Sequence, residues 1–328
     1  MNDQAFLPDL DPRRLAATLR ALAREDFCVF VQCAFRILYS DKFLRNWHID
    51  AIASELTRLA NGDTRRLIIT VPPRTLKSFI GSICYPAWLL GRNPGEKIIC
   101  VSYGHELSGD FGYLTRKLME SIWYQRVFPQ TRIDPKRASR DRLTTTRGGY
   151  RYSTSTGGTL TGRGGAFIII DDPLKAADAH SETARENGVT WFKSTVLSRL
   201  NNPREGRIVV IAQRLHMEDL PGQLLAQGGW QELRVPLIPD RDQSIPLISG
   251  TIIERPAGHI LHEERFDEQE IASLRAAMGE QDFEAQYNQR PLPPGGALFK
   301  LQWVSRYDGR PPTRKVQGIF QSCESAYD

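Results

Sequence analysis

A short loop between an apolar strand and an apolar helix constrains this chain more than any other segment. The apolar run at residues 67–70 is typical of a buried strand, and it leads into the sequence Val-Pro-Pro-Arg-Thr-Leu-Lys-Ser at residues 71–78. An apolar, helix-compatible stretch follows at residues 79–90. A strand, a tight loop ending in Lys-Ser and the start of a helix form the layout of a loop that wraps the phosphates of a nucleotide.

The end of this loop carries the residues that a phosphate site needs. The Lys77 ammonium would lie near the β- and γ-phosphates, and the Ser78 hydroxyl would ligate Mg²⁺. The strict pattern G-x-x-x-x-G-K-[ST] is not met, because Pro72 or Pro73 stands near the first glycine and Leu76 replaces the second. An ordinary strand-to-helix turn therefore stays an alternative. Other segments of the chain must supply the remaining groups of a nucleotide site if the loop binds phosphate.

A second buried run, at residues 166–170, ends in the paired carboxylates Asp171 and Asp172 before Pro173. Unpaired carboxylates at the end of a buried strand are costly, so they need a reason to be there. We expect Asp171 to hold Mg²⁺ through its water shell, and Asp172 to orient or deprotonate the attacking water. The alternative is that both residues start a turn before Pro173, a common use of Asp-Pro.

Two further segments carry candidate residues. The apolar run at residues 207–212 ends in Gln213, at the edge where open α/β sheets bind ligands, so Gln213 is a candidate sensor of the γ-phosphate; the alternative is a cap for the next turn. Residues 131–165 interleave arginines with Thr, Ser, Gly and Tyr. This segment could track a phosphate backbone or place an arginine at a neighbouring subunit's γ-phosphate, and the alternative is a solvated basic hairpin.

The order of the predicted elements gives three regions. Residues 1–62 read as a helical N-terminal segment, in which Trp47 could contact an adenine ring or simply pack in the core. Residues 63–290 alternate strands and helices, which predicts parallel βαβ units around one sheet. Within them, the Pro-rich stretch at residues 236–258 is expected to be irregular. Residues 291–328 begin as a Pro- and Gly-rich linker and contain one further predicted strand.

Composition narrows the class of protein. A chain of 328 residues with 41% hydrophobic and 25% charged residues has the profile of a soluble globular protein. Its net charge of +5 suits an anionic partner such as nucleic acid but does not demand one. The five cysteines show no CxxC spacing, so neither a disulfide framework nor a zinc site is indicated. No signal peptide or membrane-spanning run is present, and we expect a cytoplasmic protein.

Taken together, six segments resemble the large terminase subunit of tailed bacteriophages and prophages. The resemblance covers residues 25–328, and its order and spacing fit that family as well as its motifs do. It implies an α/β fold: an ATPase domain of the additional-strand P-loop type, with a mainly parallel central sheet flanked by helices, joined to an RNase H-like nuclease. The six segments are residues 72–78, 86–91, 102–103, 160–164, 168–173 and 213–220.

The resemblance also implies ATP and Mg²⁺ as cofactors and a role for each candidate residue. Asp172 would be the catalytic carboxylate, Arg74 would reach the γ-phosphate, and Gln213 would couple hydrolysis to movement. Arg163 is a second candidate for an arginine that acts on a neighbouring subunit. The metal ligands would be Ser78 and Asp171, and the phosphate-binding residues would be Pro73, Arg74, Thr75, Leu76, Lys77 and Ser78.

The activity that the resemblance implies is a DNA-packaging motor. Such a subunit hydrolyses ATP under stimulation by double-stranded DNA and moves that DNA into a procapsid. Its partners would be the portal protein and the small terminase subunit, and it would work as a homo-oligomeric ring in the bacterial host's cytoplasm, away from membranes. Two alternatives stay open: a non-catalytic prophage remnant that binds nucleotide or DNA, and another P-loop ATPase such as a helicase-like enzyme.

The sequence departs from the family in the nuclease region. Glu324 stands where the first metal-binding Asp of the nuclease is expected, and its longer side chain moves the carboxylate by one methylene. The other nuclease carboxylates would lie beyond residue 328. We therefore expect a truncated start of the RNase H-like domain and no endonuclease activity in this chain.

Overall fold

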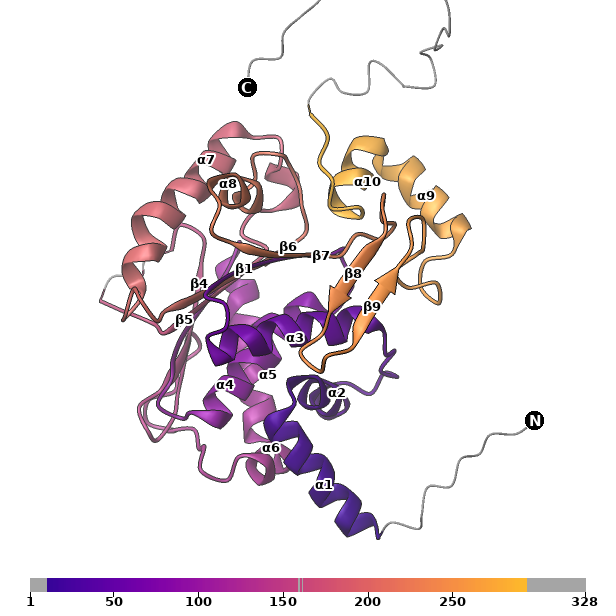
Figure 1. Ribbon diagram of the computed structural model, residues 1–328. Coiled ribbons are helices and arrows are strands. Elements are labelled where there is room, and N and C mark those ends of the chain that lie inside the picture. Colours follow the sequence, from indigo (N-terminus) through magenta and orange to yellow (C-terminus); the bar gives the residue numbers. More distant parts are fainter. Residues whose placement is uncertain (1–10, 159, 161, 294–328) are drawn as a thin grey trace, which may run out of the picture. The chain divides into compact units, whose positions relative to one another are not determined.

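The computed structural model describes residues 11–158, 160 and 162–293 (Figure 1). The chain divides into one unit at Met1–Leu292 and a second at Pro293–Asp328. The second unit is described at its first residue only. The predictions for the linker beyond residue 293, for the single strand and for Glu324 therefore lie outside the described residues.

Three helices open the described chain: α1 (Pro12–Glu25), α2 (Phe27–Leu38) and α3 (Trp47–Asn61). Their starts are capped by Asp11, Asp26 and Asn46, whose side chains accept hydrogen bonds from backbone N–H groups of the first turn. Gly62 ends α3 in the left-handed conformation, with φ 89°. The predicted helical N-terminal segment is thus confirmed over residues 12–61.

A seven-stranded sheet forms the centre of the unit, in the order β3-β4-β2-β5-β6-β1-β7. Neighbouring strands run parallel, apart from the antiparallel pair β3 and β4. The strands are β1 (Arg66–Thr70), β2 (Lys97–Ser102), β3 (Arg142–Thr144), β4 (Tyr150–Ser155), β5 (Phe167–Asp171), β6 (Arg207–Ala212) and β7 (Gln231–Arg234).

The position of β6 defines the fold class. This strand lies between β1, which leads into the Lys-Ser loop, and β5, which ends in Asp171. An extra strand between those two is what distinguishes the additional-strand arrangement, so the predicted α/β fold with a mainly parallel sheet is confirmed. The carboxyl ends of all three strands reach the same edge of the sheet.

Helices cover both faces of the sheet (Figure 1). One face carries α1 to α3 together with the later helices of the first half, and the other carries α7, η3 and α8. Successive strand residues alternate between two apolar clusters: Ile69 packs with the first group, and Ile68 packs with the second. The covering elements are η1 (Phe79–Cys84), α4 (Tyr85–Arg92), α5 (His105–Glu120), α6 (Ile122–Val127), η2 (Ala176–Asp178), α7 (Glu182–Trp191), η3 (Phe192–Val196), η4 (Leu197–Arg199) and α8 (Leu220–Gln227).

The structure corrects the sequence interpretation in two segments. Residues 236–258, expected to be irregular, contain the antiparallel hairpin β8 (Gln243–Pro246) and β9 (Ile252–Arg255) ahead of α9 (Glu268–Met278) and α10 (Glu280–Gln286). The arginine-rich segment is not a solvated hairpin throughout, because β4 joins the central sheet and Arg151 is buried there. Among the described helices, none is long and apolar enough to cross a membrane.

Candidate nucleotide-binding site

Three strand ends bring the predicted site residues together. Thr70 of β1 pairs with Ala212 of β6, and Asp171 of β5 pairs with Ile211 of the same strand. The residues that follow these positions are the Lys-Ser loop, Asp172 and Gln213. They therefore meet at one edge of the sheet although they lie far apart in the sequence.

Lys77 contacts two other polar side chains at this edge of the sheet. Its Nζ atom lies 3.0 Å from Asp172 Oδ1 and donates a hydrogen bond of 3.4 Å to Gln213 Oε1. The Lys77 residue is only 6% exposed, whereas the Asp172 side chain keeps 23% of its surface accessible. A nearly buried ammonium held by two polar side chains can move to the oxygens of a phosphate, which carries more negative charge than one carboxylate.

Asp171 is fully buried beside this ion pair. Its Oδ2 atom accepts a hydrogen bond of 2.8 Å from the Ser82 hydroxyl, and its Oδ1 atom has no described hydrogen-bond partner. Burial, together with the nearby charge of Asp172, raises the pKa of the Asp171 carboxyl from 3.8 to about 7, and the Lys77 ammonium opposes this rise. A buried carboxylate with one free oxygen fits the expected metal ligand, because a cation would supply the missing partner.

The loop has the backbone shape of a glycine-containing phosphate loop without the glycines. Leu76, at the position of the second glycine, has φ 63°, and Arg74 has the same value. Inside the loop, the Thr75 hydroxyl donates a hydrogen bond of 2.7 Å to the Pro72 carbonyl. The missing glycines therefore do not contradict the predicted loop, since the leucine adopts the left-handed conformation that glycine would supply.

This strain predicts a difference between two substitutions at Arg74, whose side chain is exposed. The Arg74→Gly chain is expected to be more stable than the Arg74→Ala chain by about 1 kcal/mol, because only alanine retains the cost of a positive φ. Chemical denaturation of both variants measures the difference. The same two substitutions at exposed Arg137, which has no positive φ, are the control and should not favour glycine. Equal stabilities at Arg74 would contradict the loop geometry.

Asp172 also has a strained backbone, with φ 44°. Its N–H donates to the Ile211 carbonyl at 2.9 Å, and its Oδ1 atom accepts from the Gln213 N–H at 3.2 Å. Of the four non-glycine residues with positive φ in the described chain, Arg74, Leu76 and Asp172 belong to this one edge. Clustered strain is typical of sites where a specific side-chain placement matters more than stability.

A buried histidine, which the sequence analysis did not identify, contacts the backbone of the Lys-Ser loop. His48 Nε2 lies 3.2 Å from the Thr75 carbonyl, and the Arg265 guanidinium donates a hydrogen bond of 2.7 Å to the Arg74 carbonyl. Burial lowers the pKa of His48 to about 4. No motif marks this residue; only its place at the start of α3 brings it under the loop.

The lowered pKa of His48 predicts a stability change with pH. Between its ordinary pKa of 6.5 and about 4, the unfolded chain binds a proton that the folded chain does not, so this group destabilises the fold as pH falls. In denaturation experiments, wild type should lose roughly 3 kcal/mol relative to His48→Gln between pH 7 and pH 4. His180→Gln, at a histidine with an exposed side chain, is the control. A pH-independent gap between wild type and His48→Gln would refute this prediction.

The segment after Gln213 is built on Asp219, which caps α8. The Asp219 carboxylate accepts from Arg214 Nε at 3.0 and 3.1 Å and from the Leu215 and Gly222 N–H groups, each at 2.9 Å. The alternative that this segment caps a turn is thus correct for Arg214 and Asp219, while Gln213 itself contacts Lys77. The role of Gln213 as a sensor of the γ-phosphate stays a prediction.

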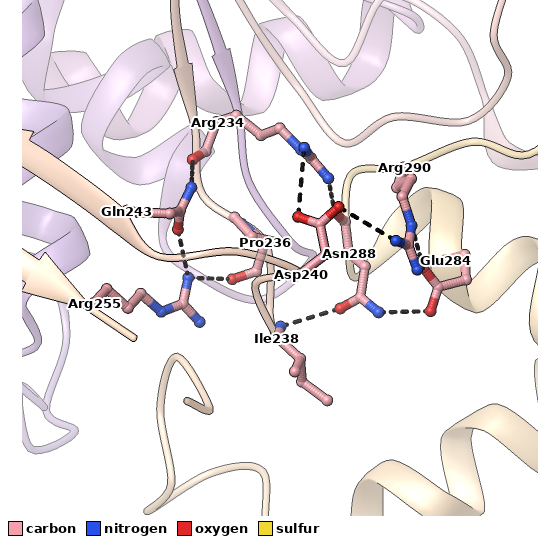
Figure 2. A network of polar contacts seen from close by, with 9 residues as sticks. All are labelled: Arg234, Pro236, Ile238, Asp240, Gln243, Arg255, Glu284, Asn288 and Arg290. Atoms are coloured by element: carbon pink, nitrogen blue, oxygen red, sulfur yellow. Dashed lines mark hydrogen bonds and ion pairs between the residues drawn. The ribbon is translucent and has the colours of Figure 1, made fainter. Parts of the chain in front are cut away.

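Residues 284–290, near the end of the described unit, are hydrogen-bonded to the segment after Gln213 and to β7. Figure 2 shows a polar network in which Asn288 accepts a hydrogen bond from Arg234 of β7 and donates one to Glu284, which also pairs with Arg290. The adjacent Gln289 Oε1 accepts from the Arg214 N–H at 2.9 Å. A continuous set of contacts therefore runs from Gln213 and Arg214 to the last residues before the predicted linker.

Two residues with a predicted role in nucleotide binding or hydrolysis contact other side chains instead. The Arg163 guanidinium lies over the Tyr152 ring at 3.9 Å, and the structure shows no contact between it and Lys77 or Asp171 among the described residues. The Trp47 ring is covered by the Arg255 guanidinium at 5.3 Å and packs against the core, which favours packing over contact with an adenine. The role of Arg163 toward a neighbouring subunit stays a prediction.

The residues present fit a magnesium nucleotide. Asp171 offers one free buried oxygen, Ser78 is partly exposed beside it, and Lys77 supplies the cation for phosphate oxygens. Within the described residues, no group of three His, Cys, Asp or Glu could hold a metal on its own. Mg²⁺ bound with a nucleotide uses one or two protein ligands and completes its shell with phosphates and water.

No protein-family model and no curated protein matches the sequence. Solved structures with a similar arrangement include the large terminase of bacteriophage HK97, at 14% identity and a TM-score of 0.40 over 60% of this chain and 39% of that one. An ATPase-domain mutant of the Thermus phage P74-26 large terminase has 15% identity and a TM-score of 0.46, over 79% and 97%. A large terminase from a thermophilic bacteriophage has 11% identity and a TM-score of 0.45, over 73% and 52%.

These solved proteins differ in how much of them the chain spans. It spans 39% of the HK97 terminase and about half of the terminase from the thermophilic bacteriophage. The latter protein has also been solved in complex with ATP-gamma-S, and that structure shares 12% identity with this chain at a TM-score of 0.40 over 73% and 51%. All are bacteriophage large terminases, the family that the sequence motifs resemble.

Proposed function

We propose that this chain is the ATP-hydrolysing motor subunit of a large terminase, which moves double-stranded DNA at the expense of ATP. The observation that carries the proposal is the convergence of Lys77, Asp171, Asp172 and Gln213 on one edge, on either side of an additional strand. This is the set of groups that phosphoryl transfer requires: a cation for the phosphates, a metal carboxylate, a second carboxylate for water, and a polar sensor.

At the proposed nucleotide site, Lys77 forms an ion pair with Asp172. Phosphate oxygens entering the loop compete with the Asp172 carboxylate for the Lys77 ammonium, which lies within 3.0 Å of it. Transfer of Lys77 to the phosphates leaves Asp172 without its cation, and a free carboxylate can then accept a proton from water. Asp172 is thus held inactive by Lys77 until nucleotide binds.

Asp171 and Ser78 would hold the metal in this site, because they are the oxygen ligands beside the loop. Mg²⁺ bound there would neutralise charge that develops on the transferred phosphoryl group. Ser82 fixes the orientation of the Asp171 carboxylate through its 2.8 Å hydrogen bond, leaving the other oxygen for the metal. Arg74, exposed at the tip of the loop, would reach the γ-phosphate of its own or a neighbouring site.

Coupling to movement would run through Gln213. Its side chain contacts Lys77, and its neighbour Arg214 is hydrogen-bonded to Gln289 at the end of the unit. A shift of Lys77 toward the phosphates therefore breaks its hydrogen bond with Gln213. Gln213 follows the end of β6, next to the Arg214 that contacts Gln289, so the change can reach residues 284–290. The basic net charge supports double-stranded DNA as the substrate. We further propose that several copies of the chain work as a ring, together with a portal protein and a small terminase subunit. The assembly would act in the cytoplasm of a bacterial host.

Displacement of a third strand from a DNA triplex tests this function. A motor that tracks along duplex DNA should release the labelled third strand in the presence of MgATP, whereas Lys77→Ala should not. A forked duplex serves as the second substrate. Separation of its strands without triplex release would identify a helicase-like enzyme instead, and no ATP-dependent change on either substrate would overturn the motor proposal.

A further inference from the structure

A buried arginine on β4 forms no direct ion pair in the described structure. Burial lowers the pKa of this arginine, and the charge of buried Asp171 partly offsets that effect. Arg151 is 1% exposed, and its guanidinium hydrogen-bonds to the Ser153 hydroxyl and, at 3.2 Å, to the Ser82 carbonyl. Its Nε atom has no partner, and no described carboxylate forms an ion pair with it. Arg214, which is also buried, is by contrast neutralised by Asp219. A buried charge without a directly paired counter-ion is costly, so Arg151 needs a reason to be there.

Arg151 lines a cavity of 270 Å³ between α5 and the β3–β4 edge of the sheet. Two more arginines, Arg116 and Arg140, line the same cavity, together with the Ser153 hydroxyl. Arg116 is paired with Glu120, but Arg140 makes no side-chain hydrogen bond to a described residue. This volume is below the usual range for drug-sized ligands, so the cavity suits a small group.

Two glycines in the middle of α5 keep this cavity open. A Cβ atom on Gly112 would lie 2.9 Å from both Arg151 Nη1 and Ser153 Oγ, and one on Gly109 would lie 3.4 Å from Arg140 Nε. Glycine inside a helix costs about 1 kcal/mol relative to alanine, so a packing reason is required. Here the reason is room for the arginine side chains.

The acidic residues of the cavity do not neutralise Arg151. Asp141 Oδ1 lies 3.1 Å from His105 Nε2, a pair that is ionic only when the histidine is protonated, and Asp110 is exposed at the rim. The cavity therefore presents one buried and one exposed guanidinium without carboxylate partners among the described residues. Guanidinium groups with free donors are the usual ligands of phosphate oxygens, which they bind through paired hydrogen bonds.

We infer that this cavity is a second phosphate-binding site, separate from the Lys-Ser loop. Its ligand is a phosphate group held by Arg140 and Arg151, with Ser153 as a further donor. That group is either inorganic phosphate or a phosphodiester of a DNA backbone, since both offer the same oxygens. The inference stands without the proposed motor function, because it concerns binding and not turnover.

Phosphate binding is measured in a Lys77→Ala background, which removes the other phosphate site. Titration calorimetry with inorganic phosphate should show one bound ion per chain, and Arg140→Ala should weaken it at least about tenfold. Gly112→Ala, which displaces the Arg151 guanidinium, should weaken it as well. Arg137→Ala, an exposed arginine that does not line the cavity, is the matched control and should have no effect.

A short duplex oligonucleotide, titrated into the same variants, distinguishes the two sources of phosphate. If Arg140→Ala weakens binding of both probes, the site takes a DNA backbone phosphate; if it weakens only inorganic phosphate, the site takes the free ion. Either result supports the site. Unchanged affinity for both probes in Arg140→Ala and Gly112→Ala, with both variants folded by circular dichroism, would overturn the inference.

Discussion

Replacing Lys77 by alanine should lower ATP turnover by at least about 10²- to 10³-fold, the cost of removing one preorganised charge from a transition state. Lys77 is the group that connects the loop to both Asp172 and Gln213. Lys77→Arg should be similarly inactive, because a planar guanidinium cannot occupy the position of a compact ammonium. Steady-state phosphate release with saturating MgATP is the measurement.

Two controls separate chemistry from folding in this experiment. Lys117→Ala removes an exposed lysine of α5 and should leave turnover unchanged. Circular dichroism and the unfolding midpoint of Lys77→Ala show whether the fold survives the loss of the ion pair with Asp172. Wild-type turnover in a folded Lys77→Ala chain would refute the assignment of the loop as the phosphate site.

Asp171→Asn should have opposite effects on activity and on the stability of the nucleotide-free chain. Activity should fall by at least about 10²-fold, because an amide is a poor ligand for Mg²⁺. The free energy of unfolding at pH 8 should instead rise above that of wild type. The wild-type carboxyl has a pKa near 7 when folded and 3.8 ordinarily, so the stability it contributes is full below pH 3.8 and is lost as pH rises through about 7.

Denaturation at pH 5 and pH 8 without metal tests the stability effect. The advantage of Asp171→Asn over wild type should be clearly larger at pH 8 than at pH 5, where the folded wild-type carboxyl is protonated. Adding MgATP at pH 8 should stabilise wild type and not the variant. Asp178→Asn, at an exposed carboxylate, is the control. An advantage that is equal at both pH values would contradict the account of Asp171.

The elements that the sequence predicts well are those with a strong apolar signal. β1, β5 and β6 each contain a continuous apolar run rich in Ile, Leu or Val, and the polar residues at or just after their ends mark the functional edge. The predicted convergence of Lys77, Asp171, Asp172 and Gln213 follows from the parallel order of these strands. Spacing alone could not place β6 between its neighbours, because strand order depends on packing across the whole sheet.

Residues whose role depends on three-dimensional packing were missed. Ser82, four residues after Ser78, holds Asp171, and that spacing on one helical face was a signal that could have found it. Nothing local marks His48 or the buried Arg151, since their environments come from distant segments. The β8–β9 hairpin was missed because each strand is only four residues long and β8 ends in a proline.

The most direct test of the central claim is ATP hydrolysis by the purified chain in the presence of Mg²⁺, measured with and without duplex DNA. We expect turnover that requires Mg²⁺, rises when duplex DNA is added and disappears in Lys77→Ala. A folded chain that neither hydrolyses nor binds MgATP would contradict it. Binding without hydrolysis under both conditions would also contradict the motor and identify a non-catalytic nucleotide-binding protein.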